Sequence, residues 1–201
     1  TLTGTVAQYK NRANIRITYT GGSACTAPPD AGAATASPNT PVCPTTTVSL
    51  NLTGNTAGSG QTYVWQSASA IGGPYTDIST ASIGSGLVVN PTLRTFYRAA
   101  VTCSAQTDFS DPVEVVVNPG LPGGTYTINP SLPAGGGNYQ TIQSAVDAME
   151  CGVQGPVTFN VSNTTFNEQV LIPVIINTSS TNTVTFNGNG ATIQAIPVSA
   201  T

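Results

Sequence analysis

Three acidic side chains in the C-terminal part of the chain are of the type that glycoside hydrolysis uses. Asp147 and Glu150 stand in "AVDAME", and Glu168 stands in "FNEQV". Cleavage of a glycosidic bond needs two carboxylates a few ångströms apart. No Asp, Glu or Arg follows Glu168 in the sequence. The residues therefore predict no catalytic pair, and we do not expect this chain to be an enzyme.

A second acidic group lies in "TDFSDPVE", which contains Asp108, Asp111 and Glu114. Hard cations such as calcium bind several oxygen ligands, so this group is a candidate calcium site. Its spacing differs from that of an EF-hand loop, and solvated turn residues are the alternative that we favour. We expect neither a metal site nor a cofactor.

Four cysteines, Cys25, Cys43, Cys103 and Cys151, are widely spaced, and the chain has no His. They form no CxxC motif, which argues against zinc. An even number of cysteines in a chain rich in Thr, Ser and Asn favours disulfides and a secreted, extracellular protein. Four reduced and buried thiols are the alternative. Four cysteines allow three complete pairings, and the residues alone do not choose among them.

Charge and hydropathy exclude two classes of partner. Charged residues make up 6% of the 201 residues, and the net charge is −3, whereas nucleic-acid binding needs clustered Lys or Arg. No apolar run approaches the roughly 18 residues that span a bilayer, and Pro173 interrupts "VLIPVII". The chain begins without Met or a signal peptide and ends within strand-like patterning, so we interpret it as an excerpt from a longer protein.

Residues 1–24 contain "NIRITYT", in which Ile15, Ile17 and Tyr19 alternate with polar residues at the period of a strand. This segment is too short to fold alone. We interpret it as the terminal strands of a preceding module, or as a strand donated to a neighbour. The Gly, Pro and Asp residues of "TGGSACTAPPDAG" then mark a linker.

Residues 31–118 alternate short strand patterns with turns, as in "TVSLNLTG", "QTYVWQSA", "GLVVN", "TFYRAAVTC" and "VEVVVN". Strands at this spacing without a helical stretch predict an antiparallel sandwich. We expect Trp65, Tyr63, Leu50 and Val101 in its core. A sugar-stacking platform around Trp65 and Tyr63, binding cell-surface glycans, is the alternative.

Residues 25–119, with the anchors "YVWQ" and "YRAAVTC", resemble the immunoglobulin-like modules of very large secreted surface proteins of Bacteroidota. The resemblance implies export by the type IX route and a role as a spacer or adhesive unit. It also implies a disulfide pairing. The first strand of such a sandwich starts at the pole where the sixth ends, which brings Cys25 near Cys103. Cys43 then lies at the opposite pole, toward the segment that holds Cys151.

Residues 124–201 combine one helical pattern with several strand patterns. Ile142, Ala145, Val146 and Met149 recur at helical spacing, with Thr141 as the expected N-cap and Gly152 at the C-terminus. We expect strands at "PVTFNV", "EQVLIPV", "TVTFNG" and "ATIQ", and corners at "SNTTFN" and "NTSSTN".

This segment resembles the first coils of a right-handed parallel β-helix of the pectin-lyase-like type, a family that includes enzymes and adhesins. The terminal coil of a solenoid exposes its apolar interior and unpaired strand edges. The resemblance therefore implies that the helix is a lid over that end. An ordinary surface helix is the alternative. In enzymes of this type the active residues lie on an exposed sheet of later coils.

The fold class expected is mainly β: an immunoglobulin-like sandwich followed by the capped N-terminal coils of a β-helix. We expect a non-catalytic structural or adhesive segment of a bacterial cell-surface protein that builds an extracellular fibre, appendage or adhesin. Its expected partners are further copies of itself or further modules of the same chain. The alternative is the N-terminal part of a secreted polysaccharide-degrading enzyme with catalytic coils downstream.

Overall fold

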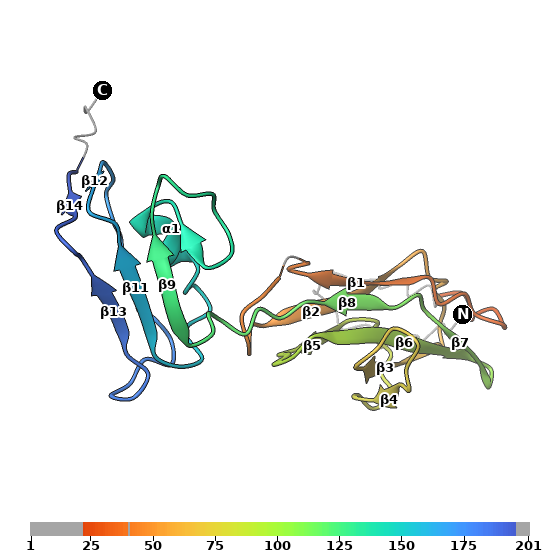
Figure 1. Ribbon diagram of the computed structural model, residues 1–201. Coiled ribbons are helices and arrows are strands. Elements are labelled where there is room, and N and C mark those ends of the chain that lie inside the picture. Colours follow the sequence, from red (N-terminus) through yellow and green to blue (C-terminus); the bar gives the residue numbers. More distant parts are fainter. Residues whose placement is uncertain (1–21, 40, 196–201) are drawn as a thin grey trace, which may run out of the picture. The chain divides into compact units, whose positions relative to one another are not determined.

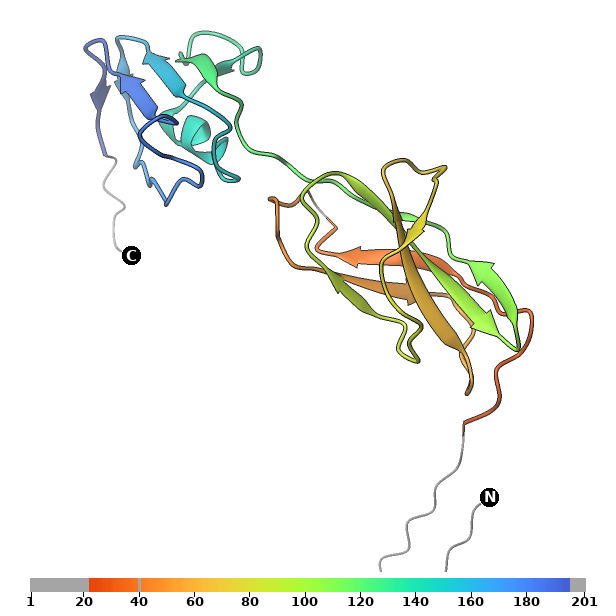
Figure 2. The same ribbon diagram turned by 90° about the horizontal axis from the view of Figure 1, so that it is seen from below.

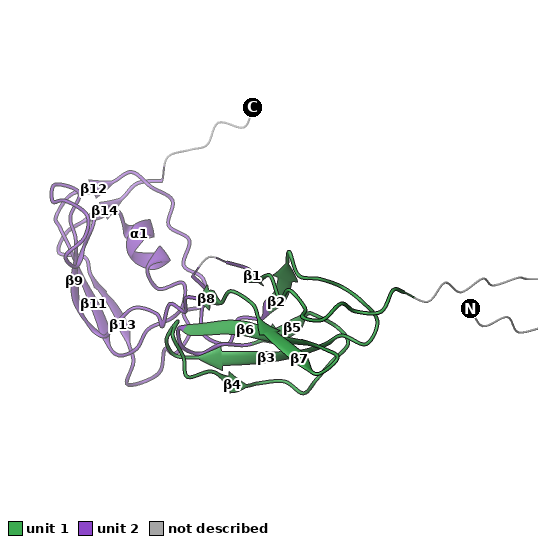
Figure 3. Cartoon of the chain, turned by 90° about the vertical axis from the view of Figure 1, so that its right-hand side faces the viewer, with its two compact units in different colours: residues 1–37, 49–89, 95–114 green, residues 38–48, 90–94, 115–201 purple. Residues whose placement is uncertain are grey.

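The structure, a computed structural model, describes residues 22–39 and 41–195 and divides into two compact units (Figures 1 and 3). Unit 1 comprises residues 1–37, 49–89 and 95–114, and unit 2 comprises residues 38–48, 90–94 and 115–201. The expectation of a mainly β chain is confirmed. The strand predicted within residues 1–24 falls almost entirely on residues 1–21, which lie outside the described residues.

Among the described residues, eight strands belong to unit 1, apart from one terminal residue each of β2 and β8; Figure 2 shows them from a second side. They are β1 (Ala33–Ser37), β2 (Val48–Thr53), β3 (Thr62–Ala68), β4 (Thr76–Asp77), β5 (Leu87–Val89), β6 (Thr95–Cys103), β7 (Gln106–Phe109) and β8 (Val113–Val115). One sheet has the order β1-β2-β5, and the other has the order β4-β3-β6-β7 with β8 also paired to β6. The pairs β1–β2, β3–β4, β3–β6 and β6–β7 are antiparallel.

The core of unit 1 follows from the alternation of side chains along its strands. Tyr63 and Trp65 on β3 are buried, as are Leu50 on β2 and Val101 on β6, where the sequence places a sandwich core. The indole Nε1–H of Trp65 donates to the carbonyl of Ser85 at 2.9 Å, so its one polar group is satisfied inside an apolar environment.

The described part of unit 2 forms one helix and six strands. They are β9 (Gly124–Ile128), β10 (Asn138–Tyr139), α1 (Ile142–Asp147), β11 (Val157–Val161), β12 (Thr165–Phe166), β13 (Val184–Asn187) and β14 (Thr192–Ile193). The four-stranded sheet has the order β10-β9-β11-β13, and every pair in it is parallel. A second, two-stranded sheet pairs β12 with β14, also in parallel.

Two of the parallel pairs share one interval. Val157 pairs with Val184, and Thr165 pairs with Thr192, so partners on β11–β13 and β12–β14 are both 27 residues apart. Phe159 stacks on Phe186 with ring centroids 4.8 Å apart, and the Asn187 amide donates to Oδ1 of Asn160 at 3.0 Å. Like side chains are thus superposed from one strand to the next.

Two expectations about local structure are wrong. "EQVLIPV", residues 168–174, forms no strand, and the short strand β12 falls instead in the predicted corner "SNTTFN". Pro173 has no N–H to donate to a ladder, which weakens this stretch as a strand. The helix is also shorter than its pattern indicates, because it ends at Asp147 with Ala148 as C-cap, and Met149 lies in the following turn.

Candidate functional site

The last strands of unit 2 leave an apolar surface at one edge of the parallel sheet, which we call the end surface. Val157 and Phe159 on β11 are fully buried, whereas Val184 and Phe186, their partners on β13, are only half-buried. The alternation of β13 directs both toward the same interior as β11. The inward side chains of β11 are therefore covered, whereas those of β13 are partly exposed to solvent.

A hollow of about 320 Å³ lies in the end surface. Its lining is apolar and comes from α1, β11, β13, β14 and the loops before and after β13: Ile142, Val161, Val170, Ile172, Phe186, Gly188, Ala191 and Ile193. Ile172 and Ile193 are 57% and 55% exposed. Contiguous apolar groups of this kind on a surface mark a place where another chain or segment packs.

The loop between β12 and β13 also exposes apolar side chains. Leu171, Val174 and Ile176 are 75%, 92% and 53% exposed. The sequence shows these residues within the apolar run "VLIPVII", but periodicity alone could not indicate that they face outward. The sequence analysis did not predict their exposure.

Helix α1 packs on the inner face of the parallel sheet. Ile142, Ala145, Val146 and Met149 are all buried in one cluster with Phe159 and the other inward residues of β11. Thr141 is the N-cap, as predicted: its Oγ1 accepts from the backbone N–H of Ser144 at 3.0 Å, and Ser144 Oγ accepts in return from the N–H of Thr141. The reciprocal pair fixes the start of a short helix.

Glu168 binds the first turn of α1. Its two carboxylate oxygens accept from the backbone N–H groups of Ile142 and Gln143 at 2.8 and 2.9 Å. A carboxylate at this position also lies favourably in the field of the helix N-terminus. Glu168 therefore holds the helix to the loop after β12, and its oxygens are engaged in that contact.

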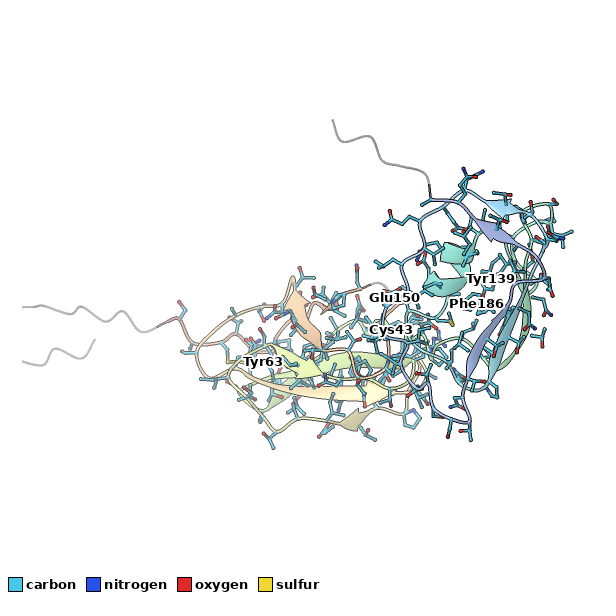
Figure 4. All side chains as sticks on the ribbon, turned by 90° about the vertical axis from the view of Figure 1, so that its left-hand side faces the viewer. Cys43, Tyr63, Tyr139, Glu150 and Phe186 are labelled. Atoms are coloured by element: carbon cyan, nitrogen blue, oxygen red, sulfur yellow. A yellow bond between two sulfur atoms is a disulfide. The ribbon has the colours of Figure 1, made fainter. Side chains whose placement is uncertain are left out.

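The other carboxylates considered for chemistry are separate from Glu168. Asp147 accepts from the Gln143 side chain at 2.8 Å, and Glu150 is exposed (Figure 4). In unit 1, Asp108 accepts from the N–H of Ala31 at 3.0 Å. Within residues 22–39 and 41–195, no group of three or more His, Cys, Asp or Glu is arranged to hold a metal ion.

An aromatic group fills the inner face of the sheet. The rings of Tyr126, Tyr139 and Phe159 have centroids 5.6 to 6.0 Å apart, and Phe186 stacks on Phe159. Burial, and secondarily the neighbouring Tyr126, raises the pKa of Tyr139 above its ordinary value. Figure 4 shows Tyr139 and Phe186 between the sheet and α1.

The outer face of the same sheet is polar and uncharged. The register aligns Thr125, Thr158 and Thr185 in one row, and Thr127, Asn160 and Asn187 in the next. An exposed solenoid sheet that cleaves polysaccharides needs carboxylates or Arg. These rows offer hydroxyls and amides instead.

Both disulfides join the cysteines that the resemblance to immunoglobulin-like modules pairs. Cys25 bonds to Cys103 across 78 residues, and Cys43 bonds to Cys151 across 108 residues. Both cysteines of the second bridge belong to unit 2. Cys43 lies within the first loop and Cys151 lies outside it, so the two covalent loops are interleaved.

One feature of unit 1 was not expected from its sequence. The guanidinium of Arg98 lies 4.1 Å from the ring centroids of both Tyr75 and Phe109, and its Nε–H donates to Gln66 at 2.8 Å. Arg98 is therefore held by two cation–π contacts on the sheet surface. Residues so far apart in the sequence gave no signal of this arrangement.

Comparison with known proteins gives one partial match. Residues 32–119 are similar to the family described as a domain of unknown function, DUF8696. No curated protein matches the chain. In the part of the chain that the structure describes, no helix is both long and apolar enough to cross a membrane.

Proposed function

We propose that this chain is a non-catalytic structural or adhesive segment of a large secreted bacterial cell-surface protein. Unit 1 serves as an immunoglobulin-like spacer, and unit 2 begins a right-handed parallel β-helix. The segment builds an extracellular fibre, appendage or adhesin. The resemblance to modules of Bacteroidota surface proteins extends the proposal to export by the type IX route.

One observation carries the proposal: two pairs of parallel strands have partners 27 residues apart, and like side chains are superposed between β11 and β13. A stack of this kind gains stability from each further layer, because every layer buries the apolar face of the one before. An elongated scaffold is the ordinary use of such a stack. Helix α1 fits the role of a cap over the first strands.

Two further observations support a scaffold over an enzyme. Glu168 is engaged by the N–H groups of α1, and the outer rows of the sheet carry Thr and Asn in place of carboxylates. The two disulfides fit an oxidising, extracellular environment. Polysaccharide degradation by downstream coils remains the competing function.

Immunogold labelling of intact cells of the source organism, with antibodies against this chain, tests the proposal. We expect label on extracellular appendages or on the cell surface. Label confined to the cell interior would contradict it. Release of reducing sugars from a polysaccharide panel by the native protein would favour the enzyme instead.

A further inference from the structure

One row of polar side chains crosses the outer face of the sheet β4-β3-β6-β7 in unit 1. The register pairs Asp77 with Gln66 and Gln66 with Arg98, so these side chains project from the same face of three adjoining strands. Trp65 and Tyr63, where the sequence allowed a sugar-stacking platform, are buried in the core. Gln66 and Arg98 are half-buried and Asp77 is exposed, so a ligand in solvent can reach the outer row.

Two aromatic rings hold the guanidinium of Arg98 on this face. Phe109 on β7 pairs with Ala100, the next outer position after Arg98 on β6, and Tyr75 directly precedes β4 at the other end of the strand order. Both ring centroids lie 4.1 Å from the guanidinium carbon. A guanidinium that stacks on aromatic faces stays charged and keeps its N–H donors in its own plane. The edge of the group therefore remains for a ligand.

A chain of two hydrogen bonds fixes the direction of that edge. Oε1 of Gln66 accepts from Nε–H of Arg98 at 2.8 Å, and Nε2 of Gln66 donates to Oδ1 of Asp77 at 2.7 Å. Turning the amide over would lose both contacts, so Gln66 acts as a positioning residue. Within the part of the chain that the structure describes, the terminal nitrogens of Arg98 have no hydrogen-bond acceptor. They form an unpaired fork of donors.

The fork suits a carboxylate. Arg binds a carboxylate through two parallel N–H···O bonds, because the spacing of its donors matches that of the two oxygens. The rings beside the fork withdraw it partly from water, which strengthens such bonds. Neighbouring strands lie about 4.8 Å apart, so Asp77, two strands away, is roughly 10 Å from Arg98 and repels an anion there only weakly at physiological salt.

The surroundings of the fork suit a sugar more than a peptide. Phe109 is 47% exposed and offers an apolar surface beside Arg98. Asp77 is exposed and has acceptor oxygens for hydroxyl groups. A sugar acid carries a carboxylate, an apolar C–H face and hydroxyls on one rigid ring, whereas an acidic side chain of a peptide offers the carboxylate alone.

We propose that the outer face of unit 1 is a binding site for polysaccharides that contain uronic acid residues. The carboxylate of one such residue accepts from the terminal nitrogens of Arg98, and its pyranose ring packs beside Phe109. A hydroxyl of a neighbouring sugar donates to Asp77. Gln66 and Tyr75 position Arg98. The inference rests on the proposed function, because it names the ligand class of the adhesive role.

Charge makes this contact depend on one residue. Residues 22–201 contain eight acidic residues but only two basic ones, Arg94 and Arg98. This part of the chain therefore repels polyanions and supplies no diffuse basic patch for them. Binding of an acidic polysaccharide would thus report a defined site and not a general attraction.

Titration calorimetry of the full chain with alginate oligomers, which consist of uronic acids, tests the proposal. We expect saturable binding that weakens as NaCl is raised. Arg98→Gln should weaken it at least about tenfold, because the paired hydrogen bonds to the carboxylate are lost. The control Arg94→Gln changes the net charge equally and should weaken it less than about twofold. No saturable binding by the native chain, or equal effects of the two variants, would overturn the proposal.

A second variant keeps the test valid if Arg98→Gln does not fold. Gln66→Glu keeps the size of the side chain and places a carboxylate against Nε of Arg98, where it competes with the ligand for the guanidinium. We expect binding at least about tenfold weaker. The urea midpoint of the Trp65 fluorescence checks that each variant is folded. Unchanged affinity in folded Gln66→Glu would contradict the proposed site.

Two further ligands test the chemistry of the site. Alginate oligomers whose carboxyl groups are reduced to alcohols should bind at least about tenfold more weakly, and poly-L-glutamate of equal charge should also bind more weakly. Equal binding of the reduced oligomers would overturn the role of the carboxylate, and equal binding of poly-L-glutamate would overturn the role of the sugar. These outcomes are independent of immunogold labelling. A surface-labelled chain that does not bind alginate would lose this site and keep its scaffold role.

Discussion

Unit 1 and unit 2 close their cores in different ways. In unit 1, antiparallel strands bury Trp65 and Leu50. In unit 2, the parallel strands bury Phe159, whereas Phe186 is half-buried beside a hollow. Packed antiparallel sheets bury apolar side chains between them, whereas stacked parallel strands bury those of one layer against the next. Under the proposed function, unit 1 is the spacer and unit 2 is the part that begins a stack.

The largest effect should come from removing the disulfides one at a time. Cys25→Ser/Cys103→Ser opens a loop of 78 residues, and Cys43→Ser/Cys151→Ser opens one of 108 residues whose ends lie in unit 2 but which contains most of unit 1. Loop entropy predicts a loss of about 4 to 5 kcal/mol for each. Urea unfolding followed by the fluorescence of Trp65, the single tryptophan, reports unit 1, and the tyrosine circular dichroism adds unit 2. Because Trp65 lies within both loops, both variants should shift its transition, and an unchanged transition in either variant would contradict the prediction.

Two matched truncations compare the inner and outer layers of unit 2. Phe159→Ala removes a fully buried ring and should cost about 3 to 5 kcal/mol in unfolding free energy. Phe186→Ala removes its half-buried partner and should cost at most about half as much. Urea unfolding of the two variants, at concentrations that keep the chain monomeric, measures the difference. Equal losses would mean that the interior is already closed beside β13.

The contact between Glu168 and α1 should have an intermediate effect. Glu168→Gln keeps the size of the side chain but removes its charge and directs an NH₂ group at one of the two backbone donors. We expect unit 2 to lose about 1 to 3 kcal/mol of stability. Glu150→Gln, at an exposed position, is the control and should change it by less than about 0.5 kcal/mol. If Glu168→Gln does not change the stability of unit 2, the carboxylate has no structural role there. A catalytic role for Glu168 would then have to be considered again.

The smallest effect concerns stability at high pH. Burial raises the pKa of Tyr97 in unit 1, partly offset by a hydrogen bond to Thr95, and burial raises the pKa of Tyr139 in unit 2. The folded state then keeps its protons to a higher pH than the unfolded state, so stability should fall as the pH rises above about 10. Tyr139→Phe should flatten this fall in unit 2, and Tyr97→Phe should flatten it in unit 1. Thermal melts between pH 8 and 11 measure it, and an unchanged slope in either variant would contradict the assignment for that unit.

Local patterns in the sequence predicted individual strands and the helix. The alternation around Trp65 placed a buried strand, and the spacing of Ile142, Ala145 and Val146 placed a helix capped by Thr141. Polar and apolar residues at fixed intervals are read directly from the chain. The disulfide pairing required more than local pattern, because it followed from the topology that the resemblance implied.

Features that depend on tertiary neighbours could not be predicted in the same way. Residues 168–174 have an apolar run typical of a strand, yet they form a largely exposed loop, and Pro173 lacks the N–H that a ladder would need at its position. The pairing of Glu168 with the N–H groups of α1 joins residues 25 and 26 positions apart. The hollow lined by Gly188 depends on which side chains the fold brings together, and a single sequence gives no signal of that.

The interleaved disulfides have a consequence for survival outside a cell. Cys25–Cys103 and Cys43–Cys151 together span every peptide bond between residues 25 and 151. A protease that cuts once in this interval, for example in the exposed loop at residues 131–136, nicks the chain but releases no fragment. The two pieces remain one covalent molecule, so a component of an extracellular assembly would keep its connection through damage that would sever an unbridged chain.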